Sequence, residues 1–294
     1  YQPVGVVAAL VPWNFPILMA CWKLAPALAT GNSVVLKPSE KSPLTAIRMA
    51  QIAIEAGIPV GVFNVLPGFG HTVGKALALH MDVDTLVFTG SSKIAKQLMI
   101  YAGESNMKRI WLEAGGKSPN IVFNDAPNLQ KAAEAAAAAI AFNQGEVCTA
   151  GSRLLVEAEV KDELLGLIIK EMESWQPGHP LDPATTCGAV VDKQQLDTVL
   201  SYIRAGVAEG AELVIGGNQI MAESGGMYIE PTIFLNVNNK MVIAKEEIFG
   251  PVLSVITFDG MDEAISIAND SIYGLAAGVW TDNLSKAHKT AKAL

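Results

Sequence analysis

The stretch VGVVAALVPWNFPILMACWKLAPALATGNSVVLK, residues 4–37, decides the fold. Its first part, residues 4–11, is a continuous apolar run, which is typical of a strand buried on both faces of a sheet. Residues 17–31 repeat apolar residues at helical spacing and end at Gly31, and residues 33–37 form the next apolar strand. Strand, helix and strand in immediate succession predict a parallel β-α-β unit.

The same alternation continues along the chain. Ser42 and Pro43 are a cap and first-turn pair that predicts a helix running to Gly57. Further strands are predicted at 62–66, 85–88, 109–114, 119–123, 153–156, 213–217, 228–236, 252–258 and 275–280, and further helices at 72–80, 91–102, 128–142, 160–175 and 192–208. We therefore predict an α/β protein with a parallel, doubly wound, Rossmann-like first domain and a second α/β domain. The boundary is placed at Gly115-Gly116, between residues 1–115 and 116–294.

Composition excludes several classes of function. Of the 294 residues, 50% are apolar and 17% are charged, as in soluble globular proteins. A net charge of −8 without any Lys/Arg-rich block argues against nucleic acid and anionic membrane as partners. The uncharged residues 1–22 contain Pro12, Asn14 and Pro16, so we predict neither a membrane span nor a signal peptide there. Three cysteines do not make a disulfide framework in a chain of this length, so we expect a reducing, cytoplasmic location.

Both ends of the sequence look cut. Tyr1 enters an apolar strand directly, and Leu294 lies inside the helical pattern LSKAHKTAKAL. We therefore expect an internal fragment of a longer gene product. We also expect little activity from the fragment alone, because open strand edges and absent flanks would leave a site loosely held.

Cys148 is an isolated thiol in the loop FNQGEVCTAGSR, residues 142–153. No histidine lies within 20 residues of it, and no second cysteine completes a CxxC pair. The four histidines of the chain show no metal-ligand spacing, so no metal site is predicted. Cys21 and Cys187 are interpreted as core or incidental thiols.

Two glycine-containing loops and two polar side chains indicate a ligand site. The loop PGFGHTVGK, residues 67–75, fits neither the dinucleotide fingerprint nor the P-loop, because its glycines are one residue out of place. FTGSS, residues 88–92, ends a strand and opens a helix, where backbone N–H groups would suit a pyrophosphate. Glu113 directly follows the apolar residues IWL, and Asn14 follows the first predicted strand. This is the position where α/β sheets place active sites, although a solvated turn carboxylate is the simpler explanation of Glu113.

Six stretches occur in the order found in NAD(P)-dependent aldehyde dehydrogenases, and the chain resembles this family along essentially its whole length. They are PWNFP (12–16), KPSE (37–40), FTGS (88–91), LEAGGKSPNIV (112–122), FNQGEVCTAGSR (142–153) and EEIFGPV (246–252). LEAGGKSPN and GEVCTAGSR are most similar to the bacterial branch that oxidises 4-aminobutyraldehyde derivatives, including γ-glutamylated and guanidino forms, in polyamine breakdown. The resemblance implies an NAD-binding domain in residues 1–115, without its N-terminal part. It likewise implies a catalytic domain in residues 116–294, without its C-terminal part and oligomerisation strand.

The resemblance also implies a mechanism. Cys148 corresponds to the nucleophile, whose thiolate attacks the aldehyde to give a thiohemiacetal and then a thioester. The Asn14 amide and the Cys148 backbone N–H would hold the oxyanion. Glu113 corresponds to the general base that activates water, and Lys23 to a lysine of a proton path. This chemistry needs no histidine beside the thiol.

The cofactor implied by the resemblance is NAD. The matching positions are Pro12, Trp13, Lys37, Ser39, Glu40, Gly70, Gly74, Phe88, Gly90, Ser91, Ile94, Glu247 and Phe249. Glu40 would accept hydrogen bonds from ribose hydroxyls and repel a 2′-phosphate, which favours NAD over NADP. Glu247 and Phe249 would contact the nicotinamide ribose and support the ring.

The family's aldehyde tunnel corresponds to Phe15, Met19, Trp22, Val147 and Thr149. Three positions depart from the commoner pattern: Glu146 replaces Gln, Ala95 replaces Gly and Ala114 replaces Leu, and the first and third match the aminoaldehyde branch. The expected partners are a small aldehyde and other copies of the chain, in a homodimer or homotetramer of the full-length protein. Two alternatives stay open: a CoA-acylating enzyme, against which an intact Glu113 argues, and a catalytically silent fragment.

Overall fold

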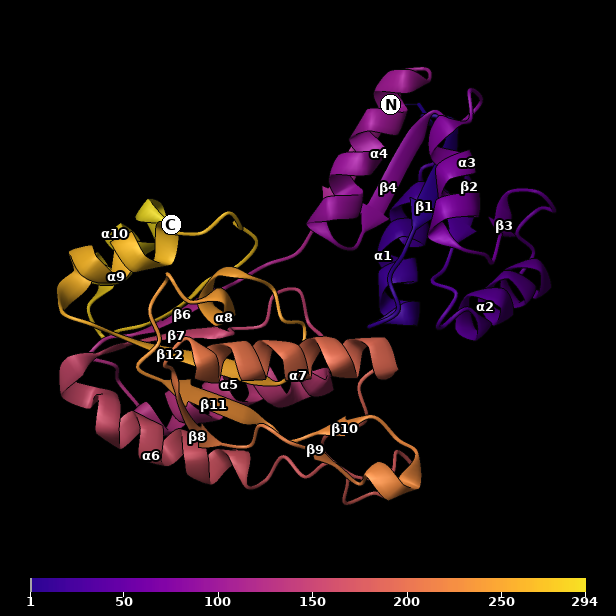
Figure 1. Ribbon diagram of the computed structural model, residues 1–294. Helices are drawn as coiled ribbons and strands as arrows, with labels where there is room; N and C mark the ends of the chain where they lie inside the picture. The colour runs from indigo at the N-terminus through magenta and orange to yellow at the C-terminus, as the bar shows by residue number, and fades with distance from the viewer. Residues whose placement is uncertain (1) are drawn as a thin grey trace. The chain divides into compact units, whose positions relative to one another are not determined.

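A computed structural model describes residues 2–294, and Figure 1 shows its ribbon. The chain divides into two compact units, Tyr1–Gly115 and Gly116–Leu294. Each unit has a main sheet of its own, with apolar cores on both faces of that sheet. The α/β fold class predicted from the sequence is therefore confirmed.

The sheet of the first unit is parallel in all its described strands, which are ordered β3-β2-β1-β4-β5. The strands are β1 (Val6–Leu10), β2 (Ser33–Lys37), β3 (Phe63–Val65), β4 (Thr85–Thr89) and β5 (Arg109–Glu113). In the order of strands, β2 and β3 follow on one side of β1. The chain then returns and adds β4 and β5 on the other side of β1. This reversal beside β1 makes the sheet doubly wound, as predicted.

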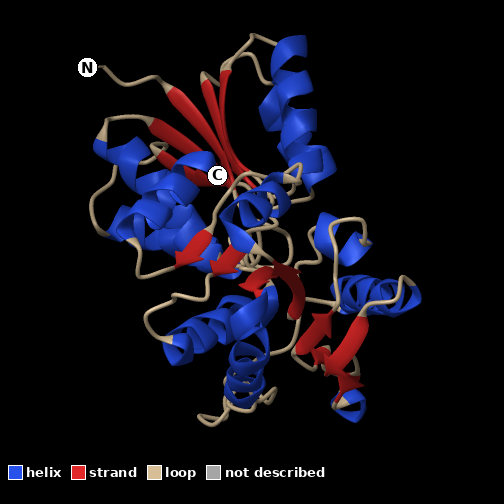
Figure 2. Cartoon of the chain, turned by 90° about the vertical axis from the view of Figure 1, so that its left-hand side faces the viewer, coloured by secondary structure: helices blue, strands red, loops and turns tan. Residues whose placement is uncertain are grey.

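Helices cover both faces of this sheet, as Figure 2 shows from a second direction. They are α1 (Pro16–Ala29), α2 (Leu44–Glu55), α3 (Lys75–Leu79) and α4 (Ser92–Glu104), with the short π-helix η1 (Gly70–Gly74) before α3. Val7 and Ala9 of β1 belong to the core with α1 and α2, whereas Ala8 and Leu10 belong to the core with α3 and α4. Because successive strand residues point to opposite faces, only an uninterrupted apolar run can bury both.

The sheet of the second unit is mixed. Its described strands are ordered β13-β6-β7-β12-β11-β8, and the pairing of β11 with β8 is antiparallel while the others are parallel. The strands are β6 (Pro119–Val122), β7 (Arg153–Glu157), β8 (Glu212–Ile215), β11 (Thr232–Leu235), β12 (Val252–Phe258) and β13 (Gly278–Trp280). A separate antiparallel ribbon joins β9 (Gln219–Ile220) to β10 (Tyr228–Ile229).

The helices of the second unit also pack on both faces of their sheet. They are α5 (Leu129–Ala141), α6 (Lys161–Met172), α7 (Lys193–Ala208), α8 (Val242–Lys245), α9 (Gly260–Asn269) and α10 (Leu284–Ala293), with short 3₁₀ turns η2 (Phe142–Gly145), η3 (Ala158–Val160) and η4 (Ala222–Ser224). One core contains α5 and α6, and the opposite core contains α7, α8 and α9. The alanines of α5 that face the sheet are fully buried, so this helix packs close to the strands.

Several predicted elements differ in detail. The predicted strand 228–236 is two strands, β10 and β11, because Pro231 between them has no N–H to donate to a ladder. Ser42 does not cap α2: Pro43 occupies the cap position, and the buried Ser42 hydroxyl has no hydrogen-bond partner within residues 2–294. Helices α8 and α9 were not predicted. No helix in the described part of the chain is both long and apolar enough to cross a membrane.

Candidate active site

The carboxyl ends of four strands meet along one edge of the first sheet. Leu10 at the end of β1 pairs with Lys37 of β2 and Phe88 of β4, and Phe88 pairs with Leu112 of β5. Because these strands are parallel and in register, the loops that follow them begin at the same level. Ligands of doubly wound sheets bind at this edge.

A pocket of about 550 Å³ lies at this edge, lined by residues of the first unit. All the cofactor residues predicted within residues 1–115 line it: Pro12, Trp13, Lys37, Ser39, Glu40, Gly70, Gly74, Phe88, Gly90, Ser91 and Ile94. They come from the ends of β2 and β4, from the loops after β1, β2 and β4, and from η1 and α4. The sequence could suggest each of them separately, and the fold brings them into one cavity.

The pocket also has lining residues that the sequence analysis missed. Gln97 and Tyr101 line it from α4, and His71 and Lys75 line it from η1 and α3. The signal for the first two was present, since Gln97 and Tyr101 follow Ile94 by three and seven residues, which is the spacing of one helical face. No comparable signal marks His71 or Lys75.

The pocket has features that fit a dinucleotide. A Cβ on Gly90 would overlap the ring of Phe88, so this position accepts only glycine. Without a side chain there, a ligand can approach the Gly90 backbone closely. Ser91 is the N-cap of α4, and its Oγ accepts a hydrogen bond from the Ile94 N–H at 3.4 Å. The N-terminus of this helix carries the positive end of the helix dipole, which favours a pyrophosphate.

Lys37 and Glu40 form an ion pair in this pocket. Lys37 is buried, and its Nζ lies 3.4 Å from Glu40 Oε2. The ammonium therefore anchors the carboxylate, whose remaining acceptor positions are available to ribose hydroxyls. This arrangement suits a ribose better than a 2′-phosphate, which would meet the carboxylate charge.

Glu113 and Lys23 belong to the same unit and interact electrostatically. Glu113 ends β5 and is exposed, and its backbone oxygen accepts a hydrogen bond from the Gly90 N–H at 3.0 Å. Lys23 lies half-buried on α1. Burial lowers its pKa from the usual value, and the Glu113 charge opposes that shift.

Cys148 follows a loop with an unusual backbone conformation in the second unit. Asn143, Gln144 and Gly145 all have positive φ, at 50°, 57° and 70°. Two of these, Asn143 and Gln144, are not glycine, so the backbone is strained a few residues before the thiol. A Cβ on Gly145 would overlap the Gly250 carbonyl, so only glycine lets these two backbones meet.

Gly116 joins the Cys148 loop to the segment around Glu247. A Cβ on Gly116 would overlap the carbonyl oxygen of Cys148. The Gly116 N–H donates a hydrogen bond to Glu247 Oε1 at 3.2 Å. Burial raises the pKa of the Glu247 carboxyl, and the Gly116 hydrogen bond and the charge of Lys117 oppose this shift. The second glycine of LEAGGKSPN is therefore required by its close approach to the Cys148 carbonyl oxygen.

Replacing Gly116 with alanine is expected to slow the reaction that the family resemblance implies at Cys148 by about 100-fold, because a displacement of roughly 1 Å at a reacting group has that effect. The added methyl group must displace the Cys148 backbone. The measurement is kcat/KM in the full-length protein, with circular dichroism to verify folding. Gly166→Ala is the control, because a Cβ there meets nothing within 4 Å. Equal losses in both variants would contradict the role of the close approach.

The other two thiols do not share this environment. Cys187 is buried, and its Sγ donates to the Ala141 carbonyl oxygen at 3.8 Å. Burial, with a smaller contribution from the Glu146 charge, raises the pKa of Cys187 to about 11, so it is protonated at neutral pH. Cys21 is exposed on α1.

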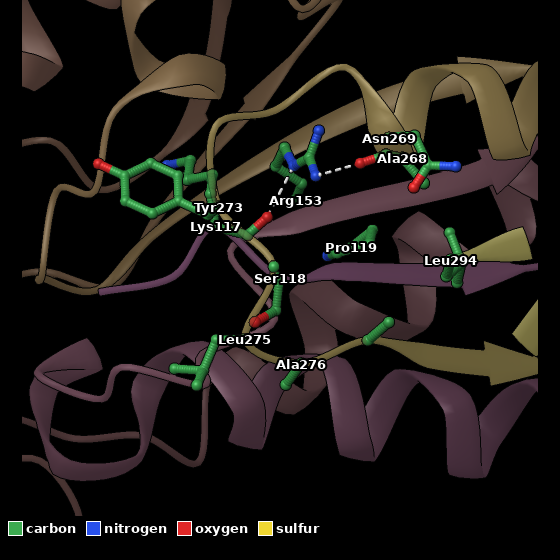
Figure 3. Close-up of a pocket in the computed structure, with 12 residues that line it drawn as sticks. Lys117, Ser118, Pro119, Arg153, Ala268, Asn269, Tyr273, Leu275, Ala276 and Leu294 are labelled. Carbon is green, nitrogen blue, oxygen red and sulfur yellow. Dashed lines mark hydrogen bonds between the residues drawn. The ribbon is translucent and has the colours of Figure 1, made fainter. Parts of the chain in front are cut away.

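Lys117 is a buried cation that the sequence analysis did not single out. It is fully enclosed, and its Nζ has no hydrogen-bond partner among residues 2–294. Figure 3 shows it beside Tyr273 in the wall of a cavity of about 220 Å³. Arg153 in the same wall is satisfied differently, because its guanidinium donates to the backbone oxygens of Lys117, Ile267 and Ala268.

The environment of Lys117 predicts a pH-dependent stability. Burial, together with the positive charge of Arg153, lowers its pKa from 10.5 to about 7, while the charges of Glu247 and Glu246 oppose the shift. Between these two pH values the unfolded chain binds more protons than the folded chain, so folding stability rises with pH in this window. The stability gained in this window is lost again as the pH falls through the pKa that Lys117 has in the folded protein.

The Lys117→Met variant is expected to be more stable than the wild type at neutral pH, on the order of a few kcal/mol. Methionine has a similar volume and carries no charge to bury. The measurement is denaturant unfolding of both full-length proteins from about pH 7 to about pH 9.5, and the gap should close as the pH rises. A gap that is independent of pH would contradict the assignment.

The predicted tunnel residues lie in both units. Phe15 and Met19 pack in the first core, and Met19 is 5% exposed beside the strands. Met19 lies on the face of α1 that covers the sheet, and its place in the tunnel stays a prediction. Trp22 is 59% exposed. Val147 is partly buried and Thr149 is exposed, on either side of Cys148.

The remaining predicted residues divide between the units. Asn14 lies in the loop between β1 and α1, whereas Glu247 and Phe249 lie in the loop after α8. No group of three or more His, Cys, Asp or Glu residues that could hold a metal occurs in residues 2–294.

The whole chain is similar to known proteins. The profile described as "Aldehyde dehydrogenase family" matches residues 1–294. The NADP/NAD-dependent aldehyde dehydrogenase PuuC of Escherichia coli (strain K12) is 57% identical over 293 residues, which cover 100% of this chain and 58% of PuuC. The chain thus spans a little over half the length of the curated relatives that it matches.

Two solved structures are similar throughout this chain. An indole-3-acetaldehyde dehydrogenase in complex with NAD⁺ is 77% identical, with a TM-score of 0.99, over 99% of this chain and 59% of that one. The γ-glutamyl-γ-aminobutyraldehyde dehydrogenase of Burkholderia cenocepacia J2315 is 61% identical, with a TM-score of 0.97, over 100% of this chain and 59% of that one. The first of these carries the cofactor that the sequence predicted. With a family profile that matches from the first residue to the last, the chain belongs to the aldehyde dehydrogenase family.

Proposed function

We propose that the full-length protein oxidises an aldehyde to its carboxylic acid with NAD⁺, through a thioester on Cys148. The observation that carries this proposal is the pocket at the edge of the first sheet, where all the cofactor residues predicted in residues 1–115 are gathered. Family membership supports the same chemistry. Residues 1–115 are proposed as the NAD-binding domain and residues 116–294 as the catalytic domain.

Cys148 is the proposed nucleophile. Its thiolate sulfur bonds to the aldehyde carbon, and the carbonyl oxygen becomes an oxyanion held by the Asn14 side-chain amide and the Cys148 N–H. The strained loop before Cys148 and the packing of Gly116 against its carbonyl oxygen support a fixed position for the thiol. Donors fixed in advance stabilise the developing charge without reorganising.

Glu113 is the proposed general base for the second half of the reaction. Its carboxylate takes a proton from water, and the hydroxide attacks the thioester carbon and releases the acid. Lys23, whose ammonium interacts with the Glu113 charge, is assigned to the path by which that proton leaves. Because the Glu113 carboxylate would accept the proton from water, this site needs no histidine.

NAD⁺, when bound, supplies the hydride acceptor. The Lys37–Glu40 pair would hold the adenosine ribose, and the N-terminus of α4 with Gly90 and Ser91 would hold the pyrophosphate. Glu247 and Phe249 are the proposed contacts of the nicotinamide ribose and ring. Glu40 favours NAD over NADP, because its carboxylate faces the pocket beside a buried lysine.

The proposed substrate class is an aminoaldehyde of polyamine breakdown. Identity to PuuC and to the γ-glutamyl-γ-aminobutyraldehyde dehydrogenase supports this class. The indole-3-acetaldehyde dehydrogenase, which is more similar in sequence, defines the competing class. Both classes share the aldehyde carbon, so the choice between them depends on the tunnel residues. Action in the cytoplasm as a homodimer or homotetramer belongs to the same proposal.

A product assay on the full-length protein tests the proposal. The protein is incubated with NAD⁺ and 4-aminobutyraldehyde, its γ-glutamyl derivative or indole-3-acetaldehyde, each with and without CoA. We expect NADH and the free acid in equal amounts, with kcat/KM highest for an aminoaldehyde. An acyl-CoA product would contradict the hydrolytic role of Glu113. A preference for the indole substrate would contradict the substrate class.

A further inference from the structure

Helix α7, Lys193–Ala208, presents one side of its surface to the segment 246–250. Gln195, Val199 and Tyr202 are spaced by four and three residues, so they lie on one helical face. Each contacts the segment EEIFG within the second unit. Nothing in the sequence analysis assigned a role to this helix.

Gln195 holds the most strained part of the segment. Phe249 has a φ of 55°, a left-handed conformation that is uncommon for a bulky residue. The Gln195 Nε2 donates to the carbonyl oxygens of Phe249 at 2.7 Å and Ile248 at 3.2 Å. The base of the Gln195 side chain is itself fixed, since Asp192 caps α7 through the Gln195 N–H at 2.9 Å. Strained backbone persists only when neighbouring groups hold it.

Val199 and Tyr202 hold the two ends of the same segment. A Cβ on Gly250 would overlap Val199, so the backbone lies directly on the helix there. The Tyr202 hydroxyl donates to Glu246 Oε2 at 2.6 Å, and burial together with this bond raises the pKa of Tyr202. The next carboxylate, Glu247, is bound instead by the Gly116 N–H. Adjacent glutamates are thus held by different partners.

We propose that Gln195 and Tyr202 are positioning residues that fix the segment 246–250 so that Glu247 and Phe249 can contact the cofactor. This inference rests on the proposed function, which assigns the cofactor contacts to those two residues. Neither positioning residue needs to touch the substrate. Gln195 sets the carbonyls on either side of the Phe249 α-carbon, and Tyr202 keeps Glu246 on the helix side.

The test is Gln195→Leu in the full-length protein, with Gln194→Leu as the matched control. Gln194 is the preceding residue of α7 and is exposed. We expect amides in the segment 246–250 to exchange hydrogen faster in the cofactor-free variant. We also expect the Kd for NAD⁺ to rise about tenfold, as the loss of roughly one to two hydrogen bonds predicts. The control should change neither quantity.

The possible outcomes separate the inference from the function on which it rests. Unchanged exchange would overturn the positioning role and leave the proposed function standing. Faster exchange with unchanged NAD⁺ affinity would overturn the assignment of Glu247 and Phe249 as cofactor contacts, and the inference with it. Both effects together support the inference.

Gln195→Glu adds a readout that a packing role would not change. A protonated carboxyl can still donate to a carbonyl oxygen, whereas an ionised one repels both carbonyls. We therefore expect NAD⁺ affinity, relative to wild type, to recover severalfold as the pH falls from about 8 to about 5.5. The other charged or titratable groups nearby, Asp192, Tyr202, Glu246, Glu247, Lys117 and Tyr273, are common to both proteins, so the ratio isolates residue 195. A ratio that is independent of pH would overturn the proposal.

Discussion

Replacing Cys148 with alanine in the full-length protein is expected to abolish aldehyde oxidation and leave NAD⁺ binding intact. Alanine has no group that can form the thiohemiacetal, so the reaction loses its covalent route, a loss of at least about 10⁴-fold. The pocket assigned to the cofactor is lined by residues of the first unit and does not include Cys148. This variant should therefore lose the chemical step and keep its affinity for NAD⁺.

The measurement is NADH formation with 4-aminobutyraldehyde, beside titration of NAD⁺ by calorimetry. Cys187→Ala and Cys21→Ala are the controls. Burial keeps the Cys187 thiol protonated, with its pKa raised to about 11, and Cys21 is an exposed residue of α1. Both controls should keep their activity. Turnover by Cys148→Ala within about tenfold of wild type would show that another group is the nucleophile.

Replacing Glu113 with glutamine is expected to let the thioester form and then stall. Glutamine has nearly the same shape but cannot take a proton from water, and loss of a general base slows its step by roughly 10²–10⁴. Acylation of Cys148 does not use that proton transfer. The variant should therefore show a burst of NADH close to one per active site, followed by slow release of the acid.

Rapid-mixing kinetics with a reactive aldehyde resolves the two phases. Glu104→Gln is the matched control, because Glu104 is an exposed carboxylate at the end of α4 in the same unit. It should keep wild-type turnover. If Glu113→Gln shows no burst and normal steady turnover, Glu113 is not the base. A burst with normal acid release would mean that another group activates the water.

The sequence by itself was enough to predict the fold class, because the signals are local. Residues 4–11 are apolar without interruption, and the structure buries Val7 and Ala9 on one face of β1 and Ala8 and Leu10 on the other. The helical period of residues 17–31 and Gly31 predicted α1 within a few residues of its observed bounds. One local signal was misleading. Ser42 was predicted to cap the helix, but Pro43 occupies the cap position and α2 begins after it.

Short motifs in the sequence also identified most of the candidate catalytic residues. Cys148, Glu113 and Asn14 could be named from the motifs that contain them, and their roles stay predictions. Gln97 and Tyr101 were within reach of the same reasoning, since they continue the face of α4 that begins at Ile94. His71 and Lys75 were not, because nothing in their neighbours shows which side of η1 and α3 faces the pocket.

Only the tertiary structure decided which distant segments meet. Gly116 contacts the Cys148 carbonyl and binds Glu247, although these residues are separated by 32 and 131 positions in the chain. The sequence shows Gln195 only as a polar residue of an amphipathic helix, whereas the fold places its side chain beside the carbonyl of Phe249. The isolation of the Lys117 ammonium is likewise a property of the packed interior. A sequence pattern fixes the period and the chemistry of a segment, whereas close approach and burial depend on side chains that other segments bring from far along the chain.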